Sequence, residues 1–208
     1  MGRRPHGKAL SLWVNGVHVG HWLVNRGGDQ ELRYADSWVR DPRGRPLSLS
    51  LPFNFHGLSL KGPAVSNYFD NLLPDSDAIR QRAAQRFATR SESPFDLLAA
   101  IGRDCVGALQ ILGEDEEPQG IDRIEGVPQT EESIERHLSE SVGGHRRSFG
   151  VDHDDDFRIS LAGAQEKTAF LRSGGRWLVP RGSTPTTHIF KLPASCRKTS
   201  ARRWAAPR

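Results

Sequence analysis

The sequence predicts an α+β protein, in which a small N-terminal β-sheet module with packed helices is followed by further short antiparallel strands. Three local patterns indicate this. Asn15-Gly16 lies between two apolar runs, which is the strongest short signal for a β-hairpin. Ser93-Pro94 supplies a helix N-cap followed by proline at the first helical position. Residues 173–176 (Ser-Gly-Gly-Arg) form a second turn between apolar runs.

The first fifty residues predict a small antiparallel sheet. Strands are expected at residues 10–14 and 17–24, on either side of the Asn-Gly turn. Further strands are expected at residues 32–34 and 37–40. Residues 47–51 (Leu-Ser-Leu-Ser-Leu) alternate strictly between apolar and polar, as a half-buried strand does.

Three tryptophans lie in these predicted strands: Trp13, Trp22 and Trp38. Together with neighbouring arginines they could form a binding surface. We interpret them instead as core anchors, because a small sheet needs large side chains to bury enough area.

The middle of the chain predicts helices. Residues 67–73 form a short amphipathic segment that Pro74 ends, because proline cannot continue a helix. The acidic residues at 75–77 suit the start of a second helix. Residues 95–101 predict a third helix, and residues 105–112 predict a return to a strand.

The second half of the chain predicts a separate unit. An acidic run and several glycines make residues 113–129 a predicted surface linker, and Thr130 then caps a helix. Four strands are expected after this helix: residues 157–161, 167–171, 177–179 and 187–191. The predicted organisation is therefore a module at 10–112, a linker at 113–129 and a second unit at 130–193.

The charge of the chain is concentrated at its end. The formal net charge is +4, but residues 194–208 contain five basic side chains and no acid, so residues 1–193 carry a formal charge of −1. The high overall pI is therefore no argument for nucleic-acid binding by the folded part. If the tail binds nucleic acid, we expect nonspecific attraction that is lost as salt rises.

Several protein classes are excluded by composition. Apolar stretches are only a few residues long, so no transmembrane helix is expected, and no apolar signal-peptide core follows the basic N-terminus. Cys105 and Cys196 alone make neither a disulfide framework nor a zinc site. These features predict a cytoplasmic protein without a membrane partner.

Two segments in the second unit could bind phosphate. Small residues at 162–164 lie between two strand-like segments, where backbone N–H groups can approach a phosphate closely, although an ordinary hairpin explains the same pattern. Lys191 follows two apolar residues on a predicted strand. It could pair with nucleotide phosphates or simply face water.

Taken together, these segments resemble the HipA family of bacterial toxin serine/threonine kinases of HipBA toxin–antitoxin systems. The resemblance covers residues 10 to 193 and rests on four motifs in the expected order: residues 68–75 (YFDNLLPD), 102–108 (GRDCVGA), 160–169 (SLAGAQEKTA) and 185–193 (PTTHIFKLP). It identifies the second unit as the start of a kinase-like small lobe.

The resemblance implies specific roles for residues of the second unit. The phosphate-binding loop would be Leu161, Ala162, Gly163, Ala164 and Gln165, and Lys191 would pair with the nucleotide. Ser160 matches the family's autophosphorylated serine. A phosphate there carries nearly two negative charges and could not stay buried beside the phosphates of ATP.

The family also implies ATP and Mg as cofactors, glutamyl-tRNA synthetase or a related protein as the substrate, and a HipB-like antitoxin through which DNA is contacted only indirectly. After Pro193 the resemblance stops, and the arginine- and alanine-rich residues 194–208 are typical of a frameshift or truncation scar. We find no counterpart of the family's catalytic and magnesium-binding aspartates. The acidic run at 152–156, with His153, is interpreted as a solvated surface rather than a metal site.

The expectation is therefore an N-terminal kinase fragment with weak or no ATP binding and no activity alone, so no catalytic residue and no metal ligand is assigned. The alternative is a non-enzymatic module that binds a HipB-like antitoxin or a partner kinase chain. A basic nucleic-acid binder is a weaker third interpretation, because the body of the chain is nearly neutral.

Overall fold

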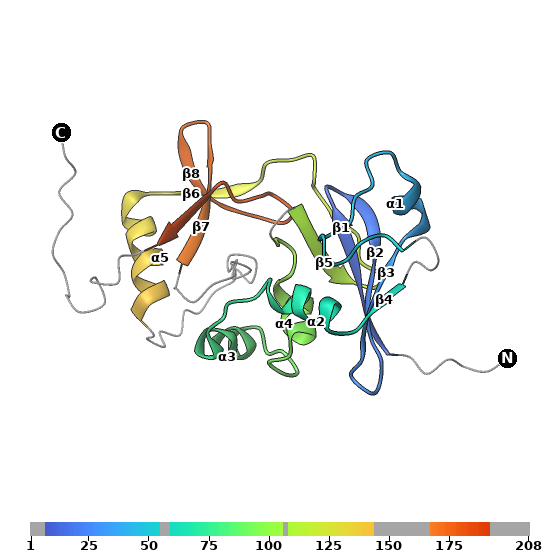
Figure 1. Cartoon of the computed structure of the whole chain (residues 1–208). Helices are drawn as coiled ribbons and strands as arrows, with labels where there is room; N and C mark the ends of the chain where they lie inside the picture. The colour runs from blue at the N-terminus through green and yellow to red at the C-terminus, as the bar shows by residue number, and fades with distance from the viewer. Residues whose placement is uncertain (1–6, 55–58, 106–107, 144–166, 192–208) are drawn as a thin grey trace.

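The computed structural model describes residues 7–54, 59–105, 108–143 and 167–191, with side chains described as far as residue 139 in the third range. These residues form an α+β structure with two antiparallel sheets, as the sequence predicts (Figure 1). Helices α2 and α4 lie beside the first sheet, α3 lies next to α4, and α5 lies beside the second sheet (Figure 1).

The first sheet has five strands in the order β4-β3-β2-β1-β5. Its strands are β1 (Lys8–Val14), β2 (Val17–Val24), β3 (Gln30–Tyr34), β4 (Ser59–Lys61) and β5 (Leu109–Gly113). The predicted hairpin is confirmed: Asn15 and Gly16 have φ values of 50° and 75°, the left-handed conformations that a tight turn with this twist requires.

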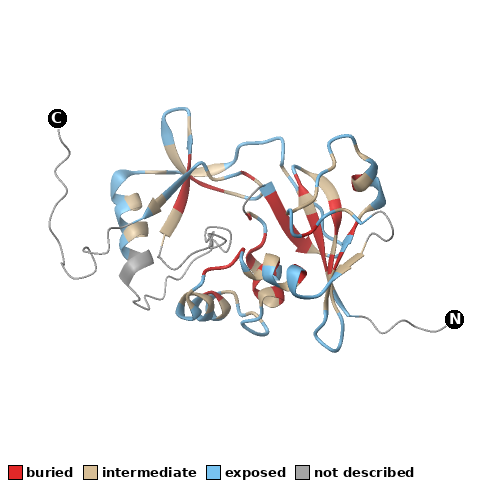
Figure 2. Ribbon diagram, in the orientation of Figure 1, coloured by how far each residue is buried: buried red, intermediate tan, exposed pale blue. Residues whose placement is uncertain are grey.

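The core of this unit lies between the sheet and two helices, α2 (Pro63–Asp70) and α4 (Pro94–Ile101). Trp22 of β2 is 0% exposed and stacks on Phe69 of α2, with ring centroids 3.8 Å apart and an interplanar angle of 6°. Phe95 of α4 tilts against the same indole at 4.9 Å. The buried residues gather at this contact between sheet and helices (Figure 2).

Two predicted strands are wrong. Residues 37–40 lie in a short helix, α1 (Asp36–Arg40), which buries Trp38 and lets its indole N–H donate to the carbonyl of Arg45. Residues 47–51 form no strand. These residues form a loop that Tyr34 holds in place. The Tyr34 hydroxyl accepts a hydrogen bond from the amide of Leu47 at 3.0 Å and donates one to the carbonyl of Leu51 at 2.7 Å.

The other elements of the first unit follow the prediction with shifted ends. Helix α2 begins at Pro63 rather than at residue 67 and ends at Asp70, before Pro74. Helix α3 (Asp77–Arg86) follows the predicted acidic residues, and α4 has the predicted Ser93 cap, whose hydroxyl accepts from the amide of Asp96. Strand β5 begins at Leu109 rather than at residue 105.

The second sheet has the order β6-β8-β7-β9. Its strands are β6 (Gly126–Gln129), β7 (Lys167–Ser173), β8 (Arg176–Pro180) and β9 (His188–Lys191). The last three confirm the predicted strands. The strand expected at residues 157–161 lies outside the described residues, as does the tail at 194–208.

The predicted linker at 113–129 is wrong at its end, because residues 126–129 form β6, an edge strand of the second sheet. Thr184 holds this region: its hydroxyl accepts from the amide of Glu125 at 2.9 Å and lies 3.3 Å from the carbonyl of Arg123. The second sheet therefore contains residues from both sides of helix α5 (Glu131–Gly143), which Thr130 caps as predicted.

The role of the Tyr34 hydroxyl is tested by Tyr34→Phe, which keeps the ring and removes both hydrogen bonds to the loop at residues 47–51. We expect the free energy of unfolding at neutral pH to fall by about 1–3 kcal/mol, because a buried donor and acceptor lose their partner. Urea unfolding measures this. Tyr68→Phe is the matched control and should change the value by less than about 0.5 kcal/mol.

We also expect the buried Tyr34 hydroxyl to make the folded protein less stable at alkaline pH. Burial raises the pKa of Tyr34 to about 12. The unfolded chain then releases this proton near pH 10, before the folded protein does, so stability should fall as the pH rises from about 10 to 12. A smaller alkaline loss in Tyr34→Phe than in the wild type is the expected result, and equal losses would exclude Tyr34 as a source.

Candidate functional site

The candidate site lies where β7 begins and β9 ends. In the antiparallel register of these strands Lys167 pairs directly with Lys191. Opposed residues in such a pair have Cβ atoms about 4.5–5.5 Å apart, and like charges at this position are destabilising. Two ammonium groups on neighbouring strands therefore create a site at which an anion relieves repulsion.

The electrostatics of Lys167 agree with this geometry. Desolvation by burial lowers its pKa most, the charge of Lys191 lowers it further, and the carboxylate of Asp75 acts in the opposite direction. The first two effects disfavour the charged ammonium. A bound phosphate would offset both effects, because its negative charge favours the charged form of the lysines.

The two faces of the second sheet differ in character. Side chains alternate between faces along a strand, so Lys167 and Lys191 project from the face opposite to Phe170 and Phe190. The aromatic face is packed: Phe170 lies edge-on to Phe190 at 5.1 Å and to His137 of α5 at 5.7 Å. Helix α5 thus contacts the aromatic face, and the opposite face carries the buried Ala169 and Leu171 beside Lys167.

Of the predicted site residues, the structure describes only Lys191, which is exposed at the end of β9, and its predicted role stays a prediction. The predicted autophosphorylation site Ser160 and the predicted loop Leu161, Ala162, Gly163, Ala164 and Gln165 lie outside the described residues, and so does the acidic run at 152–156.

Lys167 is the residue that sequence reasoning missed. It lies within the 160–169 motif, but no role was assigned to it. Only the register of β7 against β9 brings it beside Lys191, and a register between strands that are 15 residues or more apart cannot be read from spacing.

Two polar residues of the resemblance motifs have local partners. His188 is exposed, bonded through Nδ1 to the Thr187 hydroxyl at 2.8 Å and edge-on to Trp177 at 4.9 Å. Asp70 forms an ion pair with Arg80 at 2.6 Å.

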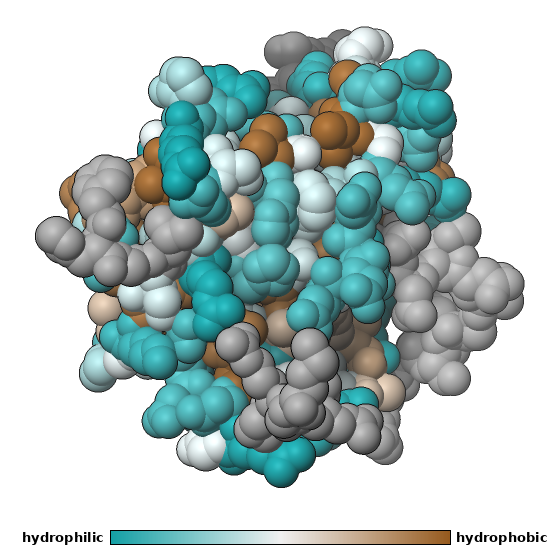
Figure 3. Space-filling model, turned by 90° about the vertical axis from the view of Figure 1, so that its right-hand side faces the viewer, coloured by the Kyte–Doolittle hydropathy of each residue, from teal (hydrophilic) through white to brown (hydrophobic). Residues whose placement is uncertain are grey.

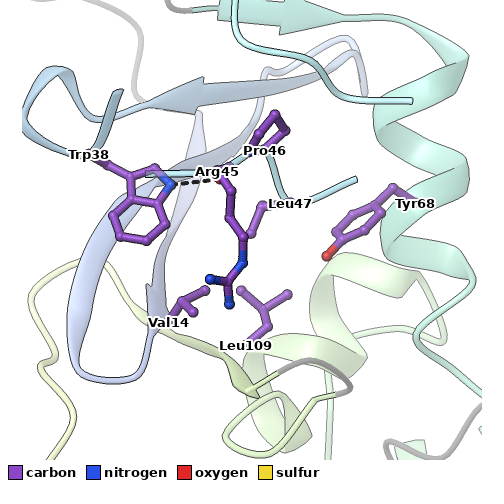
Figure 4. Close-up of a pocket in the computed structure, with 7 residues that line it drawn as sticks. All are labelled: Val14, Trp38, Arg45, Pro46, Leu47, Tyr68 and Leu109. Carbon is purple, nitrogen blue, oxygen red and sulfur yellow. Dashed lines mark hydrogen bonds between the residues drawn. The ribbon is translucent and has the colours of Figure 1, made fainter. Parts of the chain in front are cut away.

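A small pocket opens in the first unit, next to helix α1 (Figure 4). It is lined by Val14, Trp38, Arg45, Pro46, Leu47, Tyr68 and Leu109 and has a volume of about 60 Å³. Sites that bury a small-molecule ligand typically measure about 300–1,000 Å³. The pocket is therefore too small for a nucleotide.

The surface over the first sheet is mainly hydrophilic, with small separate hydrophobic patches (Figure 3). Within the described ranges, no group of three or more His, Cys, Asp or Glu side chains could hold a metal ion. No helix in that part of the chain is long and apolar enough to cross a membrane.

The chain is similar to known proteins over most of its length. Residues 10–112 match the family model described as the HipA N-terminal domain. A putative kinase, Y4mE, of Sinorhizobium fredii is 32% identical over 189 residues, which cover 89% of this chain and 43% of that protein. The serine/threonine-protein kinase toxin HipA of Shewanella oneidensis is 23% identical over 88% of this chain and 40% of that protein.

A solved structure shares the fold. It is the complex of HipA, HipB and operator DNA from Shewanella oneidensis, with a TM-score of 0.62 and 20% identity over 89% of this chain and 41% of that chain. The chain thus spans about two fifths of the length of the relatives that it matches.

The pairing of Lys167 with Lys191 predicts that the charge of Lys191 affects the titration of Lys167. Lys191→Gln removes one of the two opposed charges, so the titration midpoint of Lys167 should rise, because the repulsion from Lys191 lowers the pKa of Lys167. The 13Cε signals of labelled lysines report this midpoint. Lys61→Gln, on β4 of the other sheet, should leave it unchanged, and a fixed Lys167 midpoint in both variants would contradict the pairing.

Proposed function

Because the chain belongs, over residues 10–112, to the HipA N-terminal domain family, we propose that it provides the N-terminal part of a HipA-type serine/threonine kinase. In this proposal the lysine face of the second sheet receives the phosphates of ATP. The observation that carries it is the direct pairing of Lys167 with Lys191 on β7 and β9.

Lysine ammonium groups suit this role. Each is a compact charge with three donors, and a triphosphate carries several negative oxygens that can contact two such groups at once. The site also needs little rearrangement, because the register already holds the two lysines side by side. Their task is to bind and orient the phosphates and to neutralise charge, which is most of what phosphoryl transfer requires of a protein.

Residues 161–165 complete the proposed cradle. Only Glu166 separates this segment from Lys167. Its residues Leu161, Ala162, Gly163, Ala164 and Gln165 would cover the phosphates with backbone N–H groups. Ser160 is the proposed autophosphorylation site.

The magnesium that the family implies does not fit the described residues, since they hold no metal-binding group of side chains. We propose that the γ-phosphate is transferred to a serine or threonine of a protein such as glutamyl-tRNA synthetase, and that the catalytic aspartate belongs to the part of the relatives that this chain does not span.

A second proposal concerns a partner. The related HipA structure contains HipB and operator DNA, which supports a HipB-like antitoxin as a partner of this chain. Co-expression with a helix-turn-helix protein encoded beside it should then yield a stable complex on gel filtration. Separate elution of two folded proteins would contradict this proposal.

ATP binding tests the main proposal. We expect the 208-residue chain to bind ATP weakly, with a dissociation constant on the order of 1 mM, and Lys191→Ala to weaken binding at least about fivefold. Lys61→Ala removes the same charge from a distant strand and should have no effect. NMR titration at two salt concentrations measures the ATP affinity of both variants. Equal affinities for the two would refute the proposed phosphate site.

A further inference from the structure

One wall of the small pocket beside helix α1 is fixed by two buried aromatic side chains. The indole N–H of Trp38 donates to the carbonyl of Arg45 at 3.0 Å, and the hydroxyl of Tyr34 accepts from the amide of Leu47 at 3.0 Å. Trp38 is 4% exposed and Tyr34 is 2% exposed. The backbone on both sides of Arg45 is therefore held in place.

Most of the pocket lining is apolar. Val14 of β1 and Leu109 of β5 are direct partners in the antiparallel register, and both are buried. Pro46 adds a third apolar side chain. These side chains offer no hydrogen bonds, so the recognition of a polar ligand in this pocket depends on Arg45 and Tyr68.

The polar groups of Arg45 and Tyr68 point into this apolar space. Figure 4 shows the guanidinium of Arg45 extending toward Val14 and Leu109, and the hydroxyl of Tyr68 from α2 pointing toward the same space. Burial raises the pKa of Tyr68, so its hydroxyl stays protonated and can donate a hydrogen bond.

Arg45 differs from the arginines that precede it in the chain. Arg40 pairs with Asp36 at 2.8 Å, and Arg43 pairs with Asp41 at 2.9 Å. Within the part of the chain that the structure describes, Arg45 forms no such ion pair. A guanidinium presents its donors in a planar fork that matches the two oxygens of a carboxylate, so an anion of that shape suits this position.

We propose that this pocket binds the carboxylate of a short aliphatic acid, with Arg45 and Tyr68 donating to its oxygens and Val14 and Leu109 contacting its aliphatic end. The volume of about 60 Å³ limits the size of the buried part, since one water takes up about 30 Å³. A carboxylate with one or two further carbons suits such a volume. A free small acid and the C-terminal residue of a peptide both present this group.

Propionate is the first probe, because it joins a carboxylate to a short aliphatic chain, and propionamide is its neutral counterpart of the same shape. We expect propionate to bind the 208-residue chain saturably with a dissociation constant on the order of 1–10 mM, because so small a ligand makes few contacts. Propionamide should bind at least about tenfold more weakly, since it lacks the charge that pairs with the guanidinium. The backbone amide NMR signals of Leu47 and Leu109 measure both affinities.

Substitutions test the two donors. Arg45→Gln should weaken propionate binding at least about fivefold, and Tyr68→Phe about two- to threefold, because each removes a donor to the carboxylate. The matched control Arg43→Gln removes an equal charge from the same loop and should bind propionate as the wild type does. Since Arg45 is exposed, its substitution should leave the protein folded, which urea unfolding checks.

A short peptide identifies the source of the carboxylate. If acetyl-alanyl-alanine binds with an affinity similar to that of propionate and its C-terminal amide does not bind, the natural ligand is the C-terminus of a peptide. If propionate binds and the peptide does not, the ligand is a free small acid. Either result supports the carboxylate site.

Three results would overturn this site: no saturable binding of propionate up to about 50 mM, equal binding of propionamide, or equal affinities of Arg45→Gln and Arg43→Gln for propionate. The lysine pair of the second sheet plays no part in it. Lys191→Ala should therefore leave propionate binding unchanged, whether or not that variant alters the binding of ATP.

Discussion

The stack of Trp22 on Phe69 is the contact on which the first unit depends. It joins the middle strand of the five-stranded sheet to helix α2 with almost parallel rings, and Phe95 brings α4 to the same indole. A buried aromatic pair supplies a large area and a defined orientation in one contact. This anchor therefore holds α2 and α4 against the sheet.

The two faces of the second sheet differ in the side chains that they hold. Aromatic side chains pack with α5 on one face. The other face holds the buried Ala169 and Leu171, and the paired Lys167 and Lys191 lie at its end. Because Lys167 is half-buried and Lys191 is exposed, both charges avoid the cost of complete burial.

The sequence predicted those parts of the fold that local chemistry determines. The Asn15-Gly16 turn, the Ser93 cap and strands β7 to β9 needed only nearby residues. Residues 37–40 and 47–51 could not be predicted in the same way, because the tertiary contacts of Trp38 and Tyr34 determine their conformations. For the candidate site, the resemblance to a known family indicated Lys191, whereas Lys167 could be identified only from the register of β7 against β9.

The contacts of the Thr184 hydroxyl with Glu125 and Arg123 limit where the chain can be divided into its two units. Because this hydroxyl fastens the residues before β6 to the turn after β8, the second sheet draws one edge strand from the chain ahead of α5. A polypeptide starting at Thr130 would leave the outer edge of β8 without its neighbour and open to pairing with another molecule. A separately produced second unit should therefore include Arg123 onward, and because Glu116 pairs with Arg103 of the first unit, the cut between the two units lies within residues 117–122.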